Sequence, residues 1–386
     1  MLREGEVRIP SGCAIAALVN RRGHVFAGTM IADCIAMMRD RSNGLGGGFA
    51  AYGIYPDMKE EYALHVFFDG THERRNFEAL LRRQFQVVGT GPIPTRSNDA
   101  IKSPPVIWRY FVTPIGLDEG AANLEQFISA FIIRVNAEAD GAYIISFGQN
   151  MGVFKGVGYP EDIADFYRLD EYRGHIWTAH GRFPTNTPGW WGGAHPFALM
   201  ETTVVHNGEI SSYDANRRFI EMFGYRCSLQ TDTEVIAYTF DFLCRRQGMT
   251  LEEAAQVVAP PLWEEIALMD PESAGRFTRN RSLYGPLLLN GPFSIVLATS
   301  QGIMALNDRL KLRPMVAAET GDYLAVASEE SALRRLFPSP DRIWSPRGGE
   351  PVMGRVERAM FNSGSTMTEG RGDQSGCESA PAQVSY

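Results

Sequence analysis

Apolar runs recur along the chain and are separated by clusters of glycine, asparagine and aspartate. One of them, GCAIAALVN at residues 12–20, begins at a glycine and a cysteine and ends at the turn residues 21–23. A continuous apolar run that stops at turn residues predicts a buried strand, and Cys13 opens it. The same pattern, often rich in β-branched residues, predicts strands at residues 142–148, 175–183, 202–210, 293–306 and 323–329.

Helices are interleaved with these strands. The stretch from Ser211 to Phe223 starts with a residue suited to a helix N-cap and is followed by Gly224, a typical helix end. Residues 231–234 (Thr-Asp-Thr-Glu) form a capping-box pattern, which predicts that another helix starts there. Because the elements alternate without a regular βαβ rhythm, the pattern favours an α+β layered domain over a doubly wound sheet.

Composition and charge exclude several classes of protein. A chain of 386 residues with 44% apolar content can bury a full core. Its formal net charge of -8 gives no basic face for phosphate backbones, so we expect no nucleic-acid partner. No apolar run is long enough to span a bilayer and the N-terminus is too polar for a signal peptide, so we expect a cytoplasmic protein without a membrane partner. From about residue 361 the chain is polar and predicts a disordered tail.

Cysteine and histidine spacing gives no sign of a metal or disulfide framework. The cysteines are odd in number and irregularly spaced, without a C-x-x-C pair. Several histidines fall within one stretch but lack the spacing of a helical metal-ligand pair, so we expect no metal; they are His175, His180, His195 and His206. The glycine run at residues 44–48 lacks the Lys-Ser/Thr of a P-loop, so nucleotide binding is unsupported.

Short segments far apart in the sequence carry the candidate chemistry. They are residues 12–13 (GC), 180–187 (HGRFPTNT), 206–210 (HNGEI) and 231–234 (TDTE). Together they supply a nucleophile, a cation, an oxyanion donor pair and an anion. Hydrolysis of a primary amide whose substrate carries both a carboxylate and an ammonium group needs these four roles. Glutamine is such a substrate.

In this order the motifs resemble those of class II glutamine amidotransferases, most closely the amidotransferase domain of glutamate synthase. Residues 141–169, 307–316 (NDRLKLRPMV) and 325–330 (AVASEE) are similar to further stretches of that domain. The similarity runs from Cys13 to about Pro351. It implies an α+β fold, the four-layer αββα sandwich of N-terminal-nucleophile hydrolases. The implied division is a leader or propeptide at 1–12, an amidotransferase domain at 13–351 and a polar tail at 352–386.

The resemblance also implies catalytic roles. Cys13 matches the family nucleophile, whose thiolate attacks the amide carbon to give a γ-glutamyl thioester, with its own α-amino group as base. The side-chain amide of Asn207 and the backbone N–H of Gly208 match the oxyanion hole. Arg41 stands nearest to the place where the family has a His-Arg-Gly segment whose arginine supports the nucleophile. The chain departs from the family here, and also at Ala14, where glycine is usual.

Substrate-binding roles follow in the same way. Arg182 matches the residue that binds the substrate α-carboxylate, a task suited to a planar and permanently charged group. Thr185 and Asn186 are expected to assist it. Asp232 matches the partner of the substrate ammonium. A nucleophile that uses its own α-amino group must be the first residue, so we expect cleavage between Gly12 and Cys13.

The resemblance therefore implies a glutaminase subunit without a cofactor of its own. Its ammonia would pass to a separate synthase subunit carrying FMN and iron–sulfur clusters, which makes glutamate from 2-oxoglutarate. An N-methylglutamate synthase-like complex fits the same pattern. Two other classes stay open: a non-catalytic subunit that senses glutamine, and an amidohydrolase for another amide, which does not need the charged pair of Arg182 and Asp232.

Overall fold

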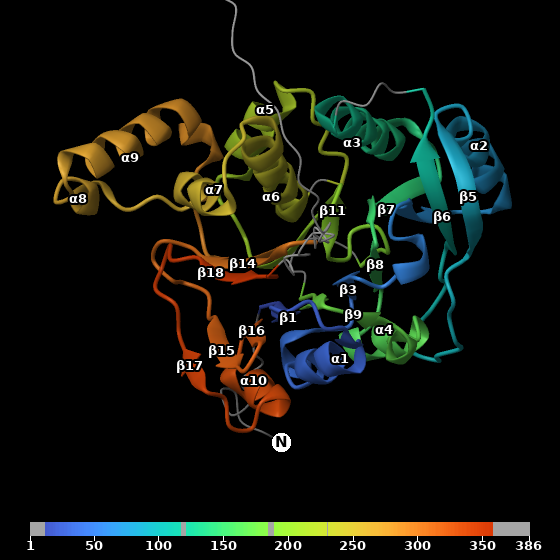
Figure 1. The fold of residues 1–386 in the computed structure, drawn as a ribbon, viewed down its shortest axis with the longest axis horizontal. Helices are drawn as coiled ribbons and strands as arrows, with labels where there is room; N and C mark the ends of the chain where they lie inside the picture. Colours follow the sequence, from blue (N-terminus) through green and yellow to red (C-terminus); the bar gives the residue numbers. More distant parts are fainter. Residues whose placement is uncertain (1–11, 117–120, 184–188, 230, 358–386) are drawn as a thin grey trace, which may run out of the picture.

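The computed structural model describes residues 12–116, 121–183, 189–229 and 231–357, and two antiparallel sheets form its centre (Figure 1). The first sheet has the strand order β17 (Arg342–Trp344), β15 (Val316–Thr320), β16 (Tyr323–Ala327), β1 (Ala14–Asn20), β10 (Ile176–Gly181), β3 (Gly47–Tyr52) and β8 (Met151–Gly156). The second has the order β11 (Phe197–Leu199), β12 (Thr202–Gly208), β13 (Phe293–Thr299), β14 (Gly302–Asn307) and β18 (Val352–Arg355).

The alternation of side chains along β1 explains why its apolar run is continuous. Ile15, Ala17 and Val19 join the core between the two sheets, together with side chains from β12, β13 and β14. Ala16 and Leu18 point the other way and pack against helices. Because successive strand residues face opposite sides, a strand covered on both faces needs apolar residues throughout.

Helices cover the outer face of each sheet, as Figure 1 shows. The helices on the first sheet are α1 (Thr29–Ala36), α4 (Pro160–Phe166) and α10 (Glu330–Leu336). Those on the second are α5 (Tyr213–Glu221), α6 (Asp232–Asp241) and α7 (Leu251–Val258). The layers therefore run helix, sheet, sheet, helix, which confirms the predicted αββα sandwich.

A third antiparallel sheet beside the sandwich was not predicted. Its strand order is β5 (Phe85–Pro92), β6 (Val106–Pro114), β4 (Tyr62–Phe68) and β7 (Ala142–Gln149). Helices α2 (Thr71–Leu81) and α3 (Ala121–Glu138) accompany it, and β7 contacts β8 and β11 of the sandwich. A further helical projection, α8 (Trp263–Ile266) and α9 (Pro271–Tyr284), lies at the upper left of Figure 1.

Most predicted strands lie where expected, but three details differ. The run at 293–306 is a hairpin of β13 and β14, because polar Ser300 and Gln301 and the positive φ of Gly302 form a turn between them. The predicted boundary at residue 351 is too early, since β18 pairs with β14 beyond it. The polar tail from residue 358 lies outside the described residues.

The third difference concerns the start of α6. Thr231 caps the helix by accepting a hydrogen bond from the backbone N–H of Thr233 at 3.2 Å. The reciprocal half of the predicted capping box is wrong. The Glu234 carboxylate instead accepts the backbone N–H groups of Ser228 and Leu229 at 3.2 and 2.9 Å. Within the described residues, no helix is long and apolar enough to cross a membrane.

Candidate active site

The candidate residues gather at one end of the sandwich strands. Cys13 directly precedes β1 and Arg182 directly follows β10, and the antiparallel register places Ala14 opposite Gly181. Residues 207–208 end β12 in the facing sheet. Strand order and register therefore bring Cys13 together with segments that lie about 170 to 195 residues further along the sequence.

Cys13 is held by a backbone donor at its sulfur and by an arginine at its carbonyl oxygen. Its Sγ accepts the backbone N–H of Phe183 at 3.4 Å, and its carbonyl oxygen accepts Arg41 Nε at 3.2 Å. Arg41 also forms an ion pair with Glu329 at 3.1 Å. Burial raises the pKa of the Cys13 thiol, although the Phe183 N–H and the charge of Arg182 oppose the rise. A thiol with a raised pKa needs a base before it can attack a carbonyl carbon.

Arg182 is only 7% exposed and is fixed through its backbone. Its N–H donates to the carbonyl of Gly46 at 2.8 Å, and its carbonyl accepts the Ser42 hydroxyl at 3.1 Å. A β-carbon on Gly46 would lie 3.1 Å from Arg182 Cδ, so the glycine run lets this loop pack closely on the arginine. Burial lowers the pKa of Arg182, and Cys13 and Asp232 counter that effect.

Asp232 is the first residue of α6. Its Oδ2 accepts the backbone N–H of Ile210 at 3.2 Å, which ties the helix to the HNGEI segment. Its Oδ1 accepts the Thr233 hydroxyl at 3.3 Å and lies 3.5 Å from Nδ1 of His206. Burial alone would raise the pKa of Asp232, but His206, the Ile210 N–H and the Thr233 hydroxyl together hold it below its usual value. The group is therefore an anion at neutral pH.

Asn207 and Gly208 have the properties of an oxyanion-binding pair. Asn207 is fully buried, and among the described residues neither polar atom of its side chain has a hydrogen-bond partner. A buried amide without a partner is costly, so such a group suits an incoming ligand. Gly208 has φ +151°, and a β-carbon there would collide with the carbonyl oxygen of Pro292. Only glycine fits this position.

Gly12 lies among these groups. A β-carbon built on it would be 3.2 Å from Nη1 of Arg313, 3.5 Å from Nη2 of Arg41 and 3.5 Å from Oδ1 of Asn207. The residue before Cys13 thus occupies space beside the candidate oxyanion donor. Arg313 was given no role from the sequence, although it belongs to the 307–316 stretch that carries the resemblance.

Two further expectations concern the residues that assist Arg182 and the clustered histidines. Thr185 and Asn186 lie outside the described residues, so their assisting role stays a prediction. Within the ranges that the structure describes, no group of three or more His, Cys, Asp or Glu side chains is arranged to hold a metal ion. His180, His195 and His206 do come together, but as a hydrogen-bonded cluster beside Asp232.

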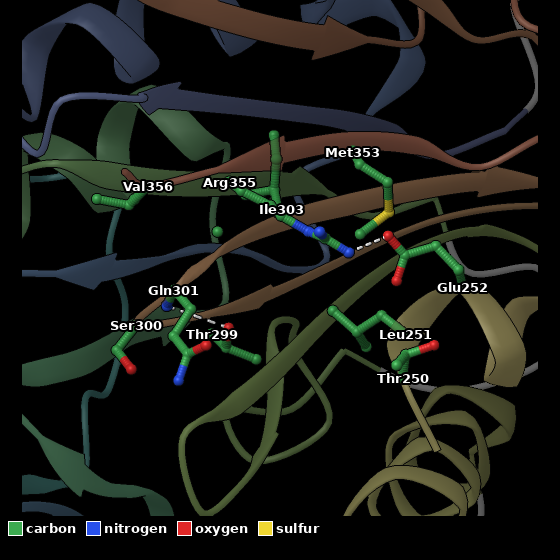
Figure 2. A pocket seen from close by; sticks show the side chains of 11 residues that line it. Thr250, Leu251, Glu252, Thr299, Ser300, Gln301, Ile303, Met353, Arg355 and Val356 are labelled. Carbon is green, nitrogen blue, oxygen red and sulfur yellow. Dashed lines mark hydrogen bonds and ion pairs between the residues drawn. The ribbon is translucent and has the colours of Figure 1, made fainter. Parts of the chain in front are cut away.

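A large cavity lies elsewhere, at the turn between β13 and β14 (Figure 2). Its volume is about 640 Å³ and it is lined by Thr250, Leu251, Glu252, Thr299, Ser300, Gln301, Gly302, Ile303, Met353, Arg355 and Val356. None of the candidate residues that the structure describes lines it. It opens at the end of β13 opposite to Phe293, which pairs with Gly208.

The fold is the four-layer αββα sandwich of the N-terminal-nucleophile hydrolases. The chain belongs to the class II glutamine amidotransferases, because the family profile described as "Glutamine amidotransferases class-II" matches residues 56–227 and 225–339. Arg182, Asn207, Gly208 and Asp232 lie within the matched residues, whereas Cys13 lies ahead of them.

The chain is also similar to individual proteins. An uncharacterized protein of Archaeoglobus fulgidus is 48% identical over 349 residues, which cover 89% of this chain and 92% of that one. The glutamine amidotransferase-like protein GlxB of Rhizobium meliloti is 29% identical, with 83% and 89% covered. The large chain of the NADPH-dependent glutamate synthase of Bacillus subtilis is 27% identical over 70% of this chain, but the match covers only 20% of that chain.

Proposed function

We propose that this chain hydrolyses L-glutamine to glutamate and ammonia through a thioester on Cys13, and that the ammonia serves a separate synthase subunit. One observation carries the proposal: a cysteine, a buried arginine, a partly buried carboxylate and a buried amide without a partner among the described residues converge at one end of the sandwich. An α-amino acid amide has a complementary set of groups, namely a carboxylate, an ammonium and a carbonyl.

The two charged residues fit the amino-acid end of glutamine. Arg182 offers a planar donor for the α-carboxylate, and Asp232 offers an anion for the ammonium. Both influence the pKa of Cys13, which places all three in one electrostatic environment. The side-chain amide of the bound substrate would then lie toward Cys13, with its carbonyl oxygen near Asn207 and Gly208.

The reaction has two stages, formation of the thioester and its hydrolysis. The Cys13 proton passes to a base, and the sulfur attacks the amide carbon to form a tetrahedral intermediate whose oxyanion is held by Asn207 and Gly208. The intermediate collapses when the C–N bond breaks and the base returns the proton to the leaving nitrogen, which departs as ammonia. Water then attacks the thioester carbon, releasing glutamate and restoring the thiol.

The base in this proposal is the α-amino group of Cys13, which requires removal of residues 1–12. The position of Gly12 supports the requirement, because it fills space next to Asn207 and Arg313. While Gly12 is attached, the Cys13 nitrogen is an amide without a basic lone pair. Active protein should therefore have a mass that corresponds to a chain starting at Cys13.

Ammonia release from purified protein tests the proposal. Wild type should release ammonia from L-glutamine and at most slowly from L-asparagine or D-glutamine, whereas Cys13→Ala should release none. If another amide is the better substrate, the chain is a different amidohydrolase. If glutamine binds in calorimetry but the wild-type protein with a free Cys13 does not hydrolyse it, the chain is a sensor. Either result overturns the proposal.

The acceptor assignment rests on the similarity to the glutamate synthase large chain. We propose that the acceptor site, with its FMN and iron–sulfur clusters, lies on a partner protein. Purification from native cells should recover a flavoprotein that raises the rate of ammonia release. With amide-¹⁵N glutamine and 2-oxoglutarate, the complex should make ¹⁵N-glutamate. An N-methylated product would favour the N-methylglutamate synthase alternative instead.

A further inference from the structure

A buried cluster of histidines stands behind Asp232, and the proposed reaction does not use it. His180 comes from β10, His195 from the loop before β11 and His206 from β12. They are 0%, 6% and 3% exposed. The rings of His180 and His195 stack with their centroids 4.2 Å apart. Burying three imidazoles is costly unless their polar nitrogens find hydrogen-bond partners.

The hydroxyl of Thr233 connects this cluster to Asp232. Its Oγ1 lies 2.7 Å from Nε2 of His195, 3.1 Å from Nδ1 of His206 and 3.3 Å from Oδ1 of Asp232. A hydroxyl has one proton and two acceptor positions, and a carboxylate only accepts. Thr233 therefore donates to Asp232 and accepts from both histidine rings.

This arrangement fixes the proton positions. His195 carries its proton on Nε2 and His206 carries one on Nδ1, since both donate to Thr233. The carbonyl of His206 accepts from Nε2 of His180 at 2.9 Å, which sets the third ring. Burial lowers the pKa of His180 to about 3 and the pKa of His195 well below its ordinary value. These two rings therefore stay neutral and act as fixed donors.

We propose that Thr233, held by His195 and His206, is a positioning residue that turns the Asp232 carboxylate toward the substrate ammonium. The inference rests on the role proposed for Asp232. Asp232 is linked to His195 through the Thr233 hydroxyl, and it contacts His206 directly. Without the hydroxyl, Oδ1 would lose a donor, and only the Ile210 N–H and the contact with His206 would orient the carboxylate. The network thus serves recognition of the α-amino group, not the attack on the amide.

The test compares two substrates. One is L-glutamine, and the other is glutaramic acid, in which hydrogen replaces the α-amino group. Thr233→Val removes the hydroxyl and keeps the shape. It should lower kcat/KM for glutamine by roughly tenfold or more, mainly through KM, because a hydrogen bond to a charged group is lost. The value for glutaramic acid should change by less than about twofold, since that substrate has no ammonium to recognise. Thr233→Ser keeps the hydroxyl and should restore the preference for glutamine.

Thr239→Val is the matched control on the same helix. Thr239 is fully buried, and among the described residues its hydroxyl has no partner. The same substitution there should leave the preference unchanged. A Thr233→Val variant that loses both substrates equally would overturn the inference, because a structural defect does not distinguish them. If that variant does not fold, Thr233→Ala provides the same comparison.

Asp232→Asn separates this inference from the function on which it rests. The variant should lose the preference for glutamine over glutaramic acid. If it keeps the preference, the role proposed for Asp232 is wrong and the positioning inference fails with it. If it loses the preference while Thr233→Val and Thr233→Ala keep it, only the positioning inference fails.

Discussion

Two buried asparagines stand at opposite ends of the sandwich and differ in how their side chains are paired. Asn20 ends β1, and its Oδ1 accepts the backbone N–H groups of Arg22 and His24 at 3.0 and 3.1 Å. Asn207 near the end of β12 has no hydrogen-bond partner for its side chain among the described residues. The first asparagine builds a turn, whereas the second is left available for a ligand.

The two ends of the sandwich at which these asparagines lie also differ. We call the end with Cys13 and Asn207 the site end, and the end with Asn20 and Ser300 the far end. Along β1 they are roughly 20 Å apart at about 3.3 Å per residue. The far end holds the cavity of Figure 2, whose lining is mostly exposed or partly exposed, although Gly302 and Ile303 are buried. The candidate site is distinguished by Asn207, whose buried amide lacks a partner among the described residues, and the cavity of Figure 2 lies away from it.

The largest expected contrast comes from substituting the two asparagines. Asn207→Ala removes an oxyanion donor and should lower kcat by about 10²–10³. Its stability should change little, because the lost amide makes no hydrogen bond within the described chain. Asn20→Ala should destabilise the protein by about 1–3 kcal/mol, because two backbone donors, those of Arg22 and His24, lose their acceptor. Its kcat should stay near wild type. Ammonia assays and urea unfolding measure both, and equal effects of the two variants would remove the contrast.

Arg182 should show the next largest effect. Arg182→Gln removes the cation proposed for the α-carboxylate and should lower kcat/KM for glutamine by about 10- to 100-fold, mainly through KM. A buried arginine often supports the fold as well, so thermal unfolding of the variant is measured in parallel. A folded variant with wild-type kcat/KM would exclude Arg182 from the site.

Glu234 should show a smaller effect on stability that depends on pH. It is 2% exposed, and burial raises its pKa to about 7 from an ordinary value of 4.5, although N–H donors and Tyr238 oppose the rise. Between these values the folded state binds more protons than the unfolded state. The stabilisation present below pH 4.5 is therefore lost as the pH rises through about 7.

Glu234→Gln cannot ionise and should not show this loss. Relative to wild type, the variant should gain about 3 kcal/mol of unfolding free energy between pH 4.5 and 8. A constant offset from the hydrogen bond that glutamine cannot accept is expected at every pH, so only the change with pH counts. Urea unfolding at several pH values measures it, and a difference independent of pH would contradict the raised pKa.

The smallest effect is expected at the far end. Arg355 forms an ion pair with Glu252 beside the cavity in Figure 2. Exposed ion pairs contribute little, so Arg355→Ala should change neither kcat/KM by more than about twofold nor stability by more than about 0.5 kcal/mol. A strong loss of glutamine hydrolysis in this variant would move the active region toward the cavity.

The sequence predicted features that depend on local pattern. The buried strand after Cys13, the strand before Arg182 and the Thr231 cap follow from apolar runs and helix-start signals, and all are present. The order of the motifs, read as a resemblance, indicated which side chains would gather. The antiparallel register of β1 and β10 then holds Cys13 and Arg182 close together.

Features that depend on long-range side-chain contacts could not be predicted. Glu234 has the spacing of a capping box, yet its carboxylate binds the preceding loop because Ser228 and Leu229 offer donors there. Thr233 looked like one more helix-start hydroxyl, and its contacts to histidines on other elements leave no local signal. The third sheet was missed for a similar reason, since its strand pairing depends on which edges meet in space.

Labelling of the nucleophile tests the central claim most directly. A glutamine analogue with a diazoketone in place of the side-chain amide alkylates a thiolate that is positioned to attack the amide carbon. Peptide mapping by mass spectrometry should find one adduct, on Cys13, in a peptide that begins with that residue, and its formation should parallel the loss of ammonia release. Excess L-glutamine should protect against it. An adduct on Cys34, Cys227 or Cys244, or complete loss of activity with Cys13 unmodified, would contradict the account.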